Sequence, residues 1–305
     1  MKDNDKILIK KLSELSFMSC DKLLELIKDE LKDYSYDINS DFSGNITINK
    51  NGTDKSVNVL FEISPIGVAQ INPLDNKGVF ETIGKYEKSD FINDVVYRDD
   101  VAAGIIREKK NDSKDEKSFY IECLEKTEEL LPEIYDFKQE LLCKDKSLYG
   151  LNLSSIISCY IAICLLKELS SCDKCIAFTL WNSSICNSLK NICTENKDLG
   201  LYVSSVSTQD GCETEKGPSI CVKDGCYVIN YATKNKVDTL LADNDECQFF
   251  AGKAITALEE YSLSNFIETL AVYYPTKHKN TKIEQIFSKD VEKTLNLLLK
   301  IIINM

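Results

Sequence analysis

The sequence predicts an α/β protein with a mostly parallel sheet that is flanked by helices and interrupted by a small β-rich domain. Helical and strand patterns alternate after Gly150, an order typical of a parallel sheet with both faces covered. Between residues 67 and 149 the pattern changes to short strands with turn signals. The 305 residues suffice for one large core and a smaller domain. We therefore expect an α/β domain from residues 1–66 and 150–305, with residues 67–149 inserted as the β-rich domain.

The first 66 residues have the pattern of helices that lead into a sheet. Within residues 1–33, Leu23, Ile27 and Leu31 fall on one face at helical spacing. Residues 41–51 alternate around a glycine turn, and residues 57–61 form an apolar strand.

The inserted part is expected to consist of short strands at residues 95–97, 101–106 and 119–122, with a turn at residues 75–78. The charged run at residues 107–117 predicts a solvated loop without a functional role.

The second half supplies the remaining elements of the expected α/β domain. They are a helix ending near residue 169, a strand at 175–180, a helix at 184–192, and strands at 201–206 and 219–222. Residues 288–303 form a strong helical pattern that starts at Ser288 as N-cap.

Charge and cysteine content restrict the class of protein. A formal net charge of -12 argues against a nucleic-acid partner, because phosphate binding depends on lysine and arginine. The 13 cysteines are odd in number and follow no apolar targeting segment, so we expect reduced thiols and a cytoplasmic protein. The sequence contains no phosphate-binding glycine motif, serine-hydrolase elbow or dinucleotide fingerprint.

The apolar segment at residues 151–166 requires a test for membrane insertion. It is shorter than the roughly 20 residues that cross a bilayer, and it carries Asn152 and three serines. We expect a buried core helix and no membrane partner.

Five stretches of the chain together resemble one family. They are residues 41–50 with 57–67 (VNVLFEISPIG), residues 75–80 with 101–106 (VAAGII), residues 150–159 (GLNLSSIISC), residues 178–184 (FTLWNSS), and residues 201–210 with 216–218 and 274–281. The chain resembles the large cytosolic metallo-aminopeptidases that form tetrahedral dodecamers, which include glutamyl aminopeptidases and endoglucanase-like peptidases. The resemblance runs nearly end to end. It implies a zinc-exopeptidase-like fold, an inserted PDZ-like or β-barrel domain used in assembly, and a two-metal peptidase site.

The positions that the resemblance assigns to this metal site carry other residues. The first ligand histidine falls on Glu62 and the aspartate beside it on Ser64, while the general-base glutamate falls on Asn182. The remaining ligand positions are occupied by Ser154, Ser183, Ser204 and Asn280.

A two-metal site needs carboxylate or imidazole ligands to hold the cations and to lower the pKa of the bridging water. Of the substituted positions, only Glu62 can bind a cation in this way. We therefore expect no metal cofactor, no catalytic residue and no peptidase activity of the family type. The expected function is that of a non-catalytic subunit, in a homo-oligomer or in a mixed oligomer with an active relative, or of a peptide-binding protein.

The alternative is a working aminopeptidase that cleaves N-terminal residues from short peptides. Its metal site would have to be rearranged, using Glu62, Asp210, Asp224, His278 or cysteines. His278 is the only histidine and lies between two lysines, which predicts an exposed loop residue. Cys172 and Cys175 have zinc or redox spacing, but the second close cysteine pair of a zinc ribbon is absent, and buried free thiols are expected.

Overall fold

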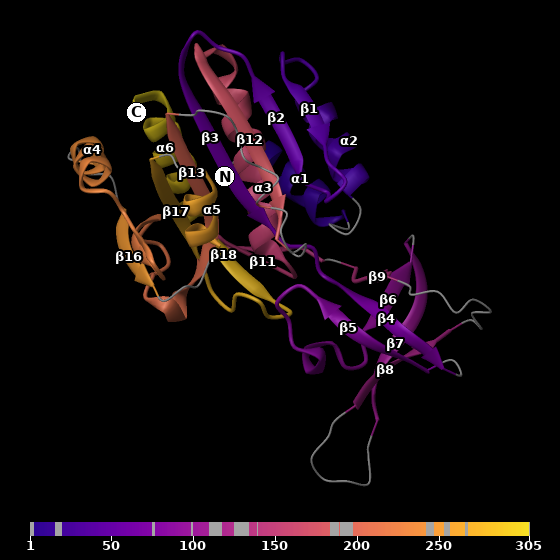
Figure 1. The fold of residues 1–305 in the computed structure, drawn as a ribbon. Coiled ribbons are helices and arrows are strands. Elements are labelled where there is room, and N and C mark those ends of the chain that lie inside the picture. Colours follow the sequence, from indigo (N-terminus) through magenta and orange to yellow (C-terminus); the bar gives the residue numbers. More distant parts are fainter. Residues whose placement is uncertain are drawn as a thin grey trace.

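The computed structural model describes most of the chain. The described residues are 3–15, 20–74, 77–98, 100–109, 118–124, 134–138, 140–183, 189, 198–241, 247–252, 257–265 and 268–304. Figure 1 shows a large sheet with helices packed against it, and a smaller group of strands that extends from one end of this sheet.

The large sheet is mixed, with a parallel centre. Its strands follow the order β1-β2-β12-β3-β13-β17-β14-β15, and β16 also pairs with β14. The bounds are β1 (Asp37–Ser40), β2 (Ile46–Lys50), β3 (Asp54–Ile63), β12 (Lys174–Asn182), β13 (Leu199–Ser207), β14 (Ser219–Asp224), β15 (Tyr227–Val228), β16 (Gln248–Gly252) and β17 (Thr269–Thr276).

The central strands β12, β3, β13 and β17 run parallel, as does the pair β14 and β16. The other pairings in this sheet are antiparallel. The predicted parallel pairing is thus found in the centre of the sheet and in the pair β14–β16, while the sheet as a whole is mixed. Two of the antiparallel pairs, β1–β2 and β14–β15, are connected by short turns, which favour this pairing.

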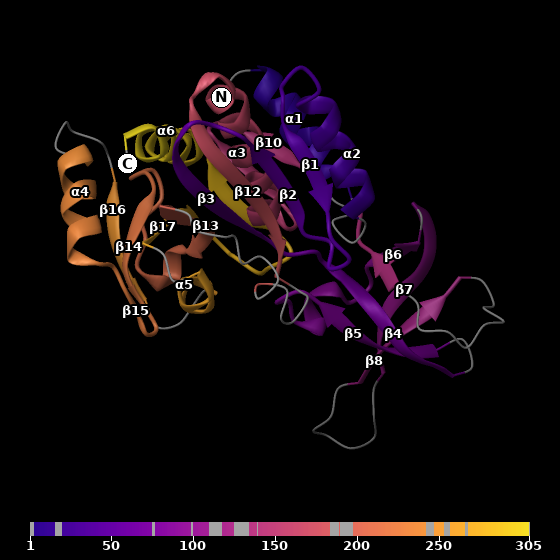
Figure 2. The same cartoon turned by 45° about the horizontal axis from the view of Figure 1, so that its top comes forward.

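Helices cover the sheet because their apolar faces continue its core. The bounds are α1 (Asp3–Ser13), α2 (Cys20–Glu30), α3 (Leu153–Glu168), α4 (Tyr231–Leu241), α5 (Leu258–Asn265) and α6 (Ser288–Asn304). Helix α3 packs on β3 between α1 and α6, while α5 packs on β13. Figure 2 places α5 on the opposite face of the sheet from α6.

Helix α3 confirms the prediction of a buried helix in this segment. Residues Leu153–Ser171 are long and apolar enough to cross a membrane, yet 72% of the window is buried inside the protein. The helix is apolar all round, as expected for a core helix that is surrounded by neighbouring elements. Helix α6 starts at Ser288, as predicted.

The smaller group of strands closes into a barrel in the order β4-β5-β8-β7-β6-β9. The bounds are β4 (Gly67–Leu74), β5 (Lys77–Ile83), β6 (Val95–Arg98), β7 (Val101–Lys109), β8 (Ser118–Cys123) and β9 (Ile134–Asp136). A single turn of 3-10 helix, η1 (Lys88–Phe91), lies between β5 and β6. The barrel has its own apolar core, in which the rings of Phe91 and Phe137 stack with centroids 4.2 Å apart.

The remaining elements connect the barrel region to the end of the chain. Strands β10 (Leu142–Lys144) and β11 (Ser147–Gly150) form a three-stranded sheet with β18 (Glu284–Phe287). Short 3-10 segments, η2 (Leu169–Ser171) and η4 (Thr208–Asp210), follow α3 and β13. The division of the chain into domains at residues 67 and 149 stays a proposal.

Two details of the sequence prediction need comment. Residues 107–109 belong to β7 and not to a loop, because this end of β7 pairs with β8, with Arg107 opposite Tyr120. The helix predicted at residues 184–192 lies outside the described residues except for residue 189, as do residues 75–76 of the predicted turn and residues 110–117 of the predicted loop.

Candidate functional site

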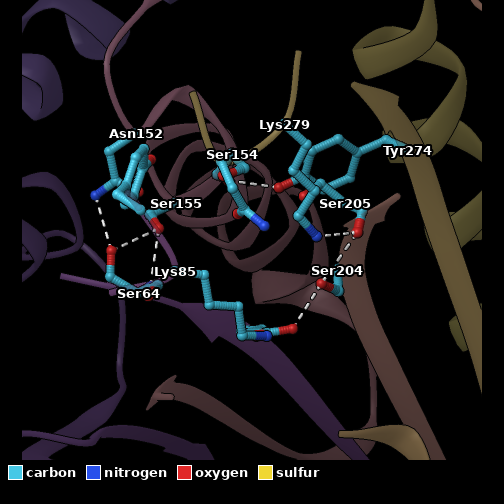
Figure 3. Close-up of a pocket in the computed structure, with 12 residues that line it drawn as sticks. Ser64, Lys85, Asn152, Ser154, Ser155, Ser204, Ser205, Tyr274 and Lys279 are labelled. Carbon is cyan, nitrogen blue, oxygen red and sulfur yellow. Dashed lines mark hydrogen bonds and ion pairs between the residues drawn. The ribbon is translucent and has the colours of Figure 1, made fainter. Parts of the chain in front are cut away.

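A small polar cavity lies where the ends of β3, β13 and β17 meet the N-terminus of α3. The carboxyl ends of parallel strands are the usual place for a ligand site in an open α/β sheet. The cavity has a volume of about 20 Å³. This volume is close to what one water molecule needs. Its lining residues are Glu62, Ser64, Lys85, Tyr86, Asn152, Ser154, Ser155, Ser204, Ser205, Tyr274, Lys279 and Asn280, most of which are labelled in Figure 3.

The structure brings five of the seven predicted site positions together in this cavity. They are Glu62, Ser64, Ser154, Ser204 and Asn280. The other two, at the end of β12, do not line it. The backbone nitrogen of Asn182 donates to Asn45 Oδ1 at 2.9 Å, and the backbone nitrogen of Ser183 donates to the Ile63 carbonyl at 2.9 Å.

Glu62 is the one acid among these positions, and its carboxylate is already partnered. Its side chain is 11% exposed. Oε2 accepts hydrogen bonds from Tyr202 Oη at 2.7 Å and from Ser204 Oγ at 2.8 Å, and Oε1 lies 3.7 Å from Lys85 Nζ. Burial alone would raise the pKa of Glu62. The charges of Lys279 and Lys85 and the two hydroxyl donors outweigh burial and lower it.

Lys279 projects into the cavity from the loop after β17. Its Nζ donates to the Ser205 carbonyl at 2.6 Å (Figure 3). Its neighbours His278 and Asn280 have φ angles of 55° and 60°, in the left-handed region that is uncommon for residues other than glycine. Burial lowers the pKa of Lys279, and attraction to Glu62 and Glu284 partly offsets this effect.

Glu284 is a second acid at the site, and it holds the N-terminus of α3. It is fully buried, and its carboxylate accepts from the backbone nitrogens of Ser154 at 2.7 Å and Asn280 at 2.9 Å. Burial raises the pKa of Glu284, while these two donors and Lys279 act in the opposite direction. Free backbone N–H groups at a helix N-terminus bind anions well, so Glu284 acts as an internal anion for α3.

The hydroxyl and amide groups that line the cavity are also engaged with one another. Asn152 Nδ2 donates to the Ser64 carbonyl at 2.8 Å, and Ser155 Oγ accepts from the Ser64 backbone nitrogen at 2.8 Å. Tyr274 Oη donates to the Ser154 carbonyl at 2.5 Å. The side chains of Asn152, Ser155 and Tyr274 therefore hold the backbone of the site in place.

Of the residues proposed for a rearranged metal site, Glu62 lines the cavity and the other named residues do not. Asp224 is buried at the end of β14, where Tyr273 Oη donates to it at 3.3 Å. Asp210 is exposed in η4, and His278 is exposed, as predicted. Neither lines the cavity.

The cysteines that the structure describes are free thiols. Cys175 Sγ accepts from the Gly52 backbone nitrogen at 3.2 Å, and Lys50 Nζ lies 3.7 Å from Cys172 Sγ. The close pair thus contacts the turn between β2 and β3, away from the cavity. Cys212 and Cys221 are buried in the large core, as expected of thiols that act as small apolar groups.

Sequence reasoning missed three charged residues of the site, namely Lys85, Lys279 and Glu284. Lys279 entered that reasoning only as a flanking charge that marks an exposed loop around His278. Lys85 comes from the segment after β5, so no short spacing connects it to the other site residues. Glu284 follows Asn280 by four residues, but nothing in the sequence indicates that its side chain turns back to the backbone of Asn280 and Ser154. Only the fold brings these three together.

The residues present do not fit a pair of divalent metal ions. Within the described part of the chain, no group of three or more His, Cys, Asp or Glu side chains could hold a metal ion. The cavity instead offers one carboxylate, several hydroxyls and two lysines. Hydroxyl oxygens are weak ligands for divalent ions, and lysine ammonium groups repel them.

The fold and the position of this cavity define an aminopeptidase-like α/β scaffold. No protein-family model matches the sequence, and neither does any curated protein sequence. Solved structures do match. The chain is similar to the TET1 peptidase of Pyrococcus horikoshii, with a TM-score of 0.82, 16% identity, and coverage of 98% of this chain and 100% of that chain.

Two further archaeal structures support the same fold. One is the TET aminopeptidase of the marine sediment archaeon Thaumarchaeota archaeon SCGC AB-539-E09, with a TM-score of 0.84 and 13% identity. This match covers 99% of the present chain and 98% of the aminopeptidase chain. Aminopeptidase APDkam598 of Desulfurococcus kamchatkensis has a TM-score of 0.85 and 12% identity. This match covers 99% of the present chain and 96% of the aminopeptidase chain. The resemblance predicted from the sequence is confirmed as a shared fold over nearly the whole chain.

Proposed function

We propose that this protein is a non-catalytic relative of the aminopeptidases whose fold it shares. The observation that carries the proposal is the composition of the cavity. Four positions assigned to metal ligands converge there with the assigned catalytic position Ser64. The single acid among them, Glu62, is bound by Tyr202 and Ser204 and faces Lys85.

The chemistry of peptide hydrolysis explains why this composition matters. A metal-dependent peptidase needs a cation to activate water and polarise the carbonyl, and a base to take up the proton. The base position carries Asn182, which cannot accept a proton at neutral pH. The cavity of about 20 Å³ also has no room for an amino-acid side chain.

The role that remains for the protein is binding. The P. horikoshii TET1 peptidase assembles into a tetrahedron or a large octahedral shell. We propose that the present protein also forms an oligomer, with itself or with an active relative, or that it binds peptides. The net charge of -12 favours protein partners over nucleic acid, and the free thiols favour the proposed cytoplasmic location.

Metal content and turnover test the proposal together. The purified protein is incubated with zinc, cobalt or manganese, desalted, and measured for bound metal by inductively coupled plasma mass spectrometry. We expect less than one metal ion per chain and no hydrolysis of leucine or glutamate anilides. Two bound ions per chain with turnover would instead support the alternative, an aminopeptidase with a rearranged metal site.

A Glu62→Gln variant is the matched control for contaminating peptidases. Trace hydrolysis that persists in this variant comes from a contaminant, and hydrolysis that disappears comes from the site. An active aminopeptidase in the same buffer shows that the assay detects turnover.

A further inference from the structure

A second hollow lies between the barrel and the three-stranded sheet of β10, β11 and β18. It is an open groove of about 570 Å³, and it shares no lining residue with the cavity at Glu62. Leu142 of β10 and Tyr149 of β11 are direct antiparallel partners, so their side chains lie on the same face of the sheet and both line the groove. Tyr97 and Phe137 belong to the barrel part of the lining. The volume is within the range of about 300–1,000 Å³ that is typical of ligand clefts.

Large apolar side chains are exposed in this groove. Leu142 and Ile283 are each 60% exposed. A single exposed aliphatic residue is ordinary, but two of them line this one groove beside aromatic rings. The groove therefore has the composition of an interaction surface.

Strand β10 forms one edge of the three-stranded sheet. Among the strands that the structure describes, it pairs with β11 only, and its three residues are exposed. The outer edge of such a strand carries backbone N–H and C=O groups with which an added strand can pair. Peptides that add to a sheet edge combine these backbone hydrogen bonds with pockets for alternate side chains. The groove supplies a pocket of this kind, because Leu142 of β10 lines it.

The charges at the groove favour an acidic ligand. Lys282 and Asp94 both line it and are paired with each other at 2.5 Å. Lys138 in the lining and Lys144 on β10 are exposed, and no acid of the described residues lies within ion-pair distance of either ammonium group. The further acid in the lining is Glu140, which is exposed. In a chain with a net charge of -12, these two lysines give the groove a local attraction for carboxylates.

The spacing along β10 defines what the ligand must look like. Leu142 and Lys144 are two residues apart, so their side chains project to the same face of the strand. The turn that follows contains Asp145 and Lys146, whose opposite charges offset each other. A strand added to β10 would therefore meet an apolar side chain and a positive charge, separated by one residue.

We propose that this groove and the outer edge of β10 bind an extended peptide, with an apolar side chain opposite Leu142 and an acidic side chain opposite Lys144. Both are cross-strand pairs that stabilise a sheet. The inference rests on the proposed function, of which it specifies the peptide-binding role and the class of peptide.

The test uses the full chain and a fluorescein-labelled peptide with the core Glu-Thr-Leu-Thr-Glu. This core reads the same in both directions, so it fits a parallel or an antiparallel addition. We expect saturable binding by fluorescence anisotropy, and an affinity that falls about tenfold or more with Leu142→Ser or Lys144→Glu. Both side chains are exposed, so neither substitution should disturb the fold.

Matched substitutions away from the groove serve as controls. Leu124 is 54% exposed in the barrel and Lys28 is exposed on α2, and neither lines the groove. Leu124→Ser and Lys28→Glu should leave the affinity unchanged. A peptide with the core Lys-Thr-Leu-Thr-Lys reverses the charge of the ligand. It should bind the Lys144→Glu variant more tightly than the wild-type protein, because the pair at this position is restored with opposite signs.

The outcomes separate this inference from the proposed function. No binding up to about 1 mM peptide, or equal affinities for the groove and control variants, would show that the inference is wrong. The non-catalytic function would then still stand if the protein holds no metal and turns over no substrate. If Leu142→Ser instead dissociates an oligomer of a protein that binds no peptide, the groove is an interface between copies of the chain, and the inference is again wrong. Binding that depends on Leu142 and Lys144, together with metal-dependent hydrolysis of the peptide, would support the groove and contradict the non-catalytic function.

Discussion

At the scale of single residues, a buried carboxylate at this site fixes the backbone through hydrogen bonds in addition to carrying a charge. Glu284 is fully buried and accepts from the backbone nitrogens of Ser154 and Asn280, so it joins the start of α3 to the loop that carries Lys279. One side chain thus fixes two segments that line the cavity. A substitution at Glu284 is expected to disturb both segments.

The Glu284→Ala substitution should lower the free energy of unfolding by about 3 kcal/mol, because it leaves two buried N–H donors without a charged acceptor. Glu284→Gln keeps one carbonyl oxygen and should lose less. Urea denaturation followed by circular dichroism measures both. Equal stabilities for the wild-type protein and the alanine variant would show that water replaces the carboxylate without cost.

At the scale of residues, the sequence predicted which residues lie near one another better than it predicted what their side chains contact. Glu62, Ser64 and Ser154 were expected at one site, and they do line one cavity. Their hydrogen bonds could not be predicted, because Tyr202 and Lys85 come from segments far away in the sequence. Lys279 shows the limit most clearly, since a lysine beside a loop histidine has no sequence signal that distinguishes an inward from an outward side chain.

At the scale of elements, the helices on the sheet are tied together by one acid. Glu30 at the end of α2 accepts from Lys11 Nζ of α1 at 2.9 Å and from Lys167 Nζ of α3 at 2.7 Å. Its side chain is 16% exposed. Burial would raise the pKa of Glu30, but the two lysines outweigh burial and lower it.

A lowered pKa in the folded state gives this acid a defined pH dependence. Its contribution to stability is present above the unfolded-state pKa of about 4.5 and is lost as the pH falls through the lower folded-state value. Glu30→Gln should therefore lower the melting temperature at pH 7, and the difference from the wild-type protein should shrink below pH 4.5. The exposed Glu14→Gln substitution is the control, and a pH-independent difference would contradict the prediction.

Helix α3 should be the element whose packing matters most to stability. Ile161 is fully buried in its centre, between the sheet and the neighbouring helices. Ile161→Ala should cost roughly 2–4 kcal/mol, the lost transfer energy plus that of the cavity left behind. Cys164→Ala, at a half-buried position of the same helix, should cost less. Chemical denaturation of both variants measures the difference.

The elements that the sequence predicted well are those with a strong local pattern. The strands at residues 57–61 and 201–206 and the helix from Ser288 were found in β3, β13 and α6. The strand order of the barrel and the antiparallel pairing of β14 with β17 were not predicted, because strand partners are set by tertiary contacts and not by local alternation.

At the scale of the whole molecule, the shared fold leads to an expectation about assembly. Each chain has a mass of 34.5 kDa and a net charge of -12, so subunits of an oligomer repel one another at low ionic strength. We expect light scattering after size exclusion to give a mass well above 34.5 kDa, with a larger assembled fraction at about 0.3 M salt, where the Debye length is short. EDTA should leave the measured mass unchanged, because the proposed function requires no metal ion.

Two outcomes would contradict this expectation. A monomer at every protein and salt concentration would argue against the subunit role and favour a monomeric peptide-binding protein. Dissociation by EDTA would indicate a structural metal ion between chains.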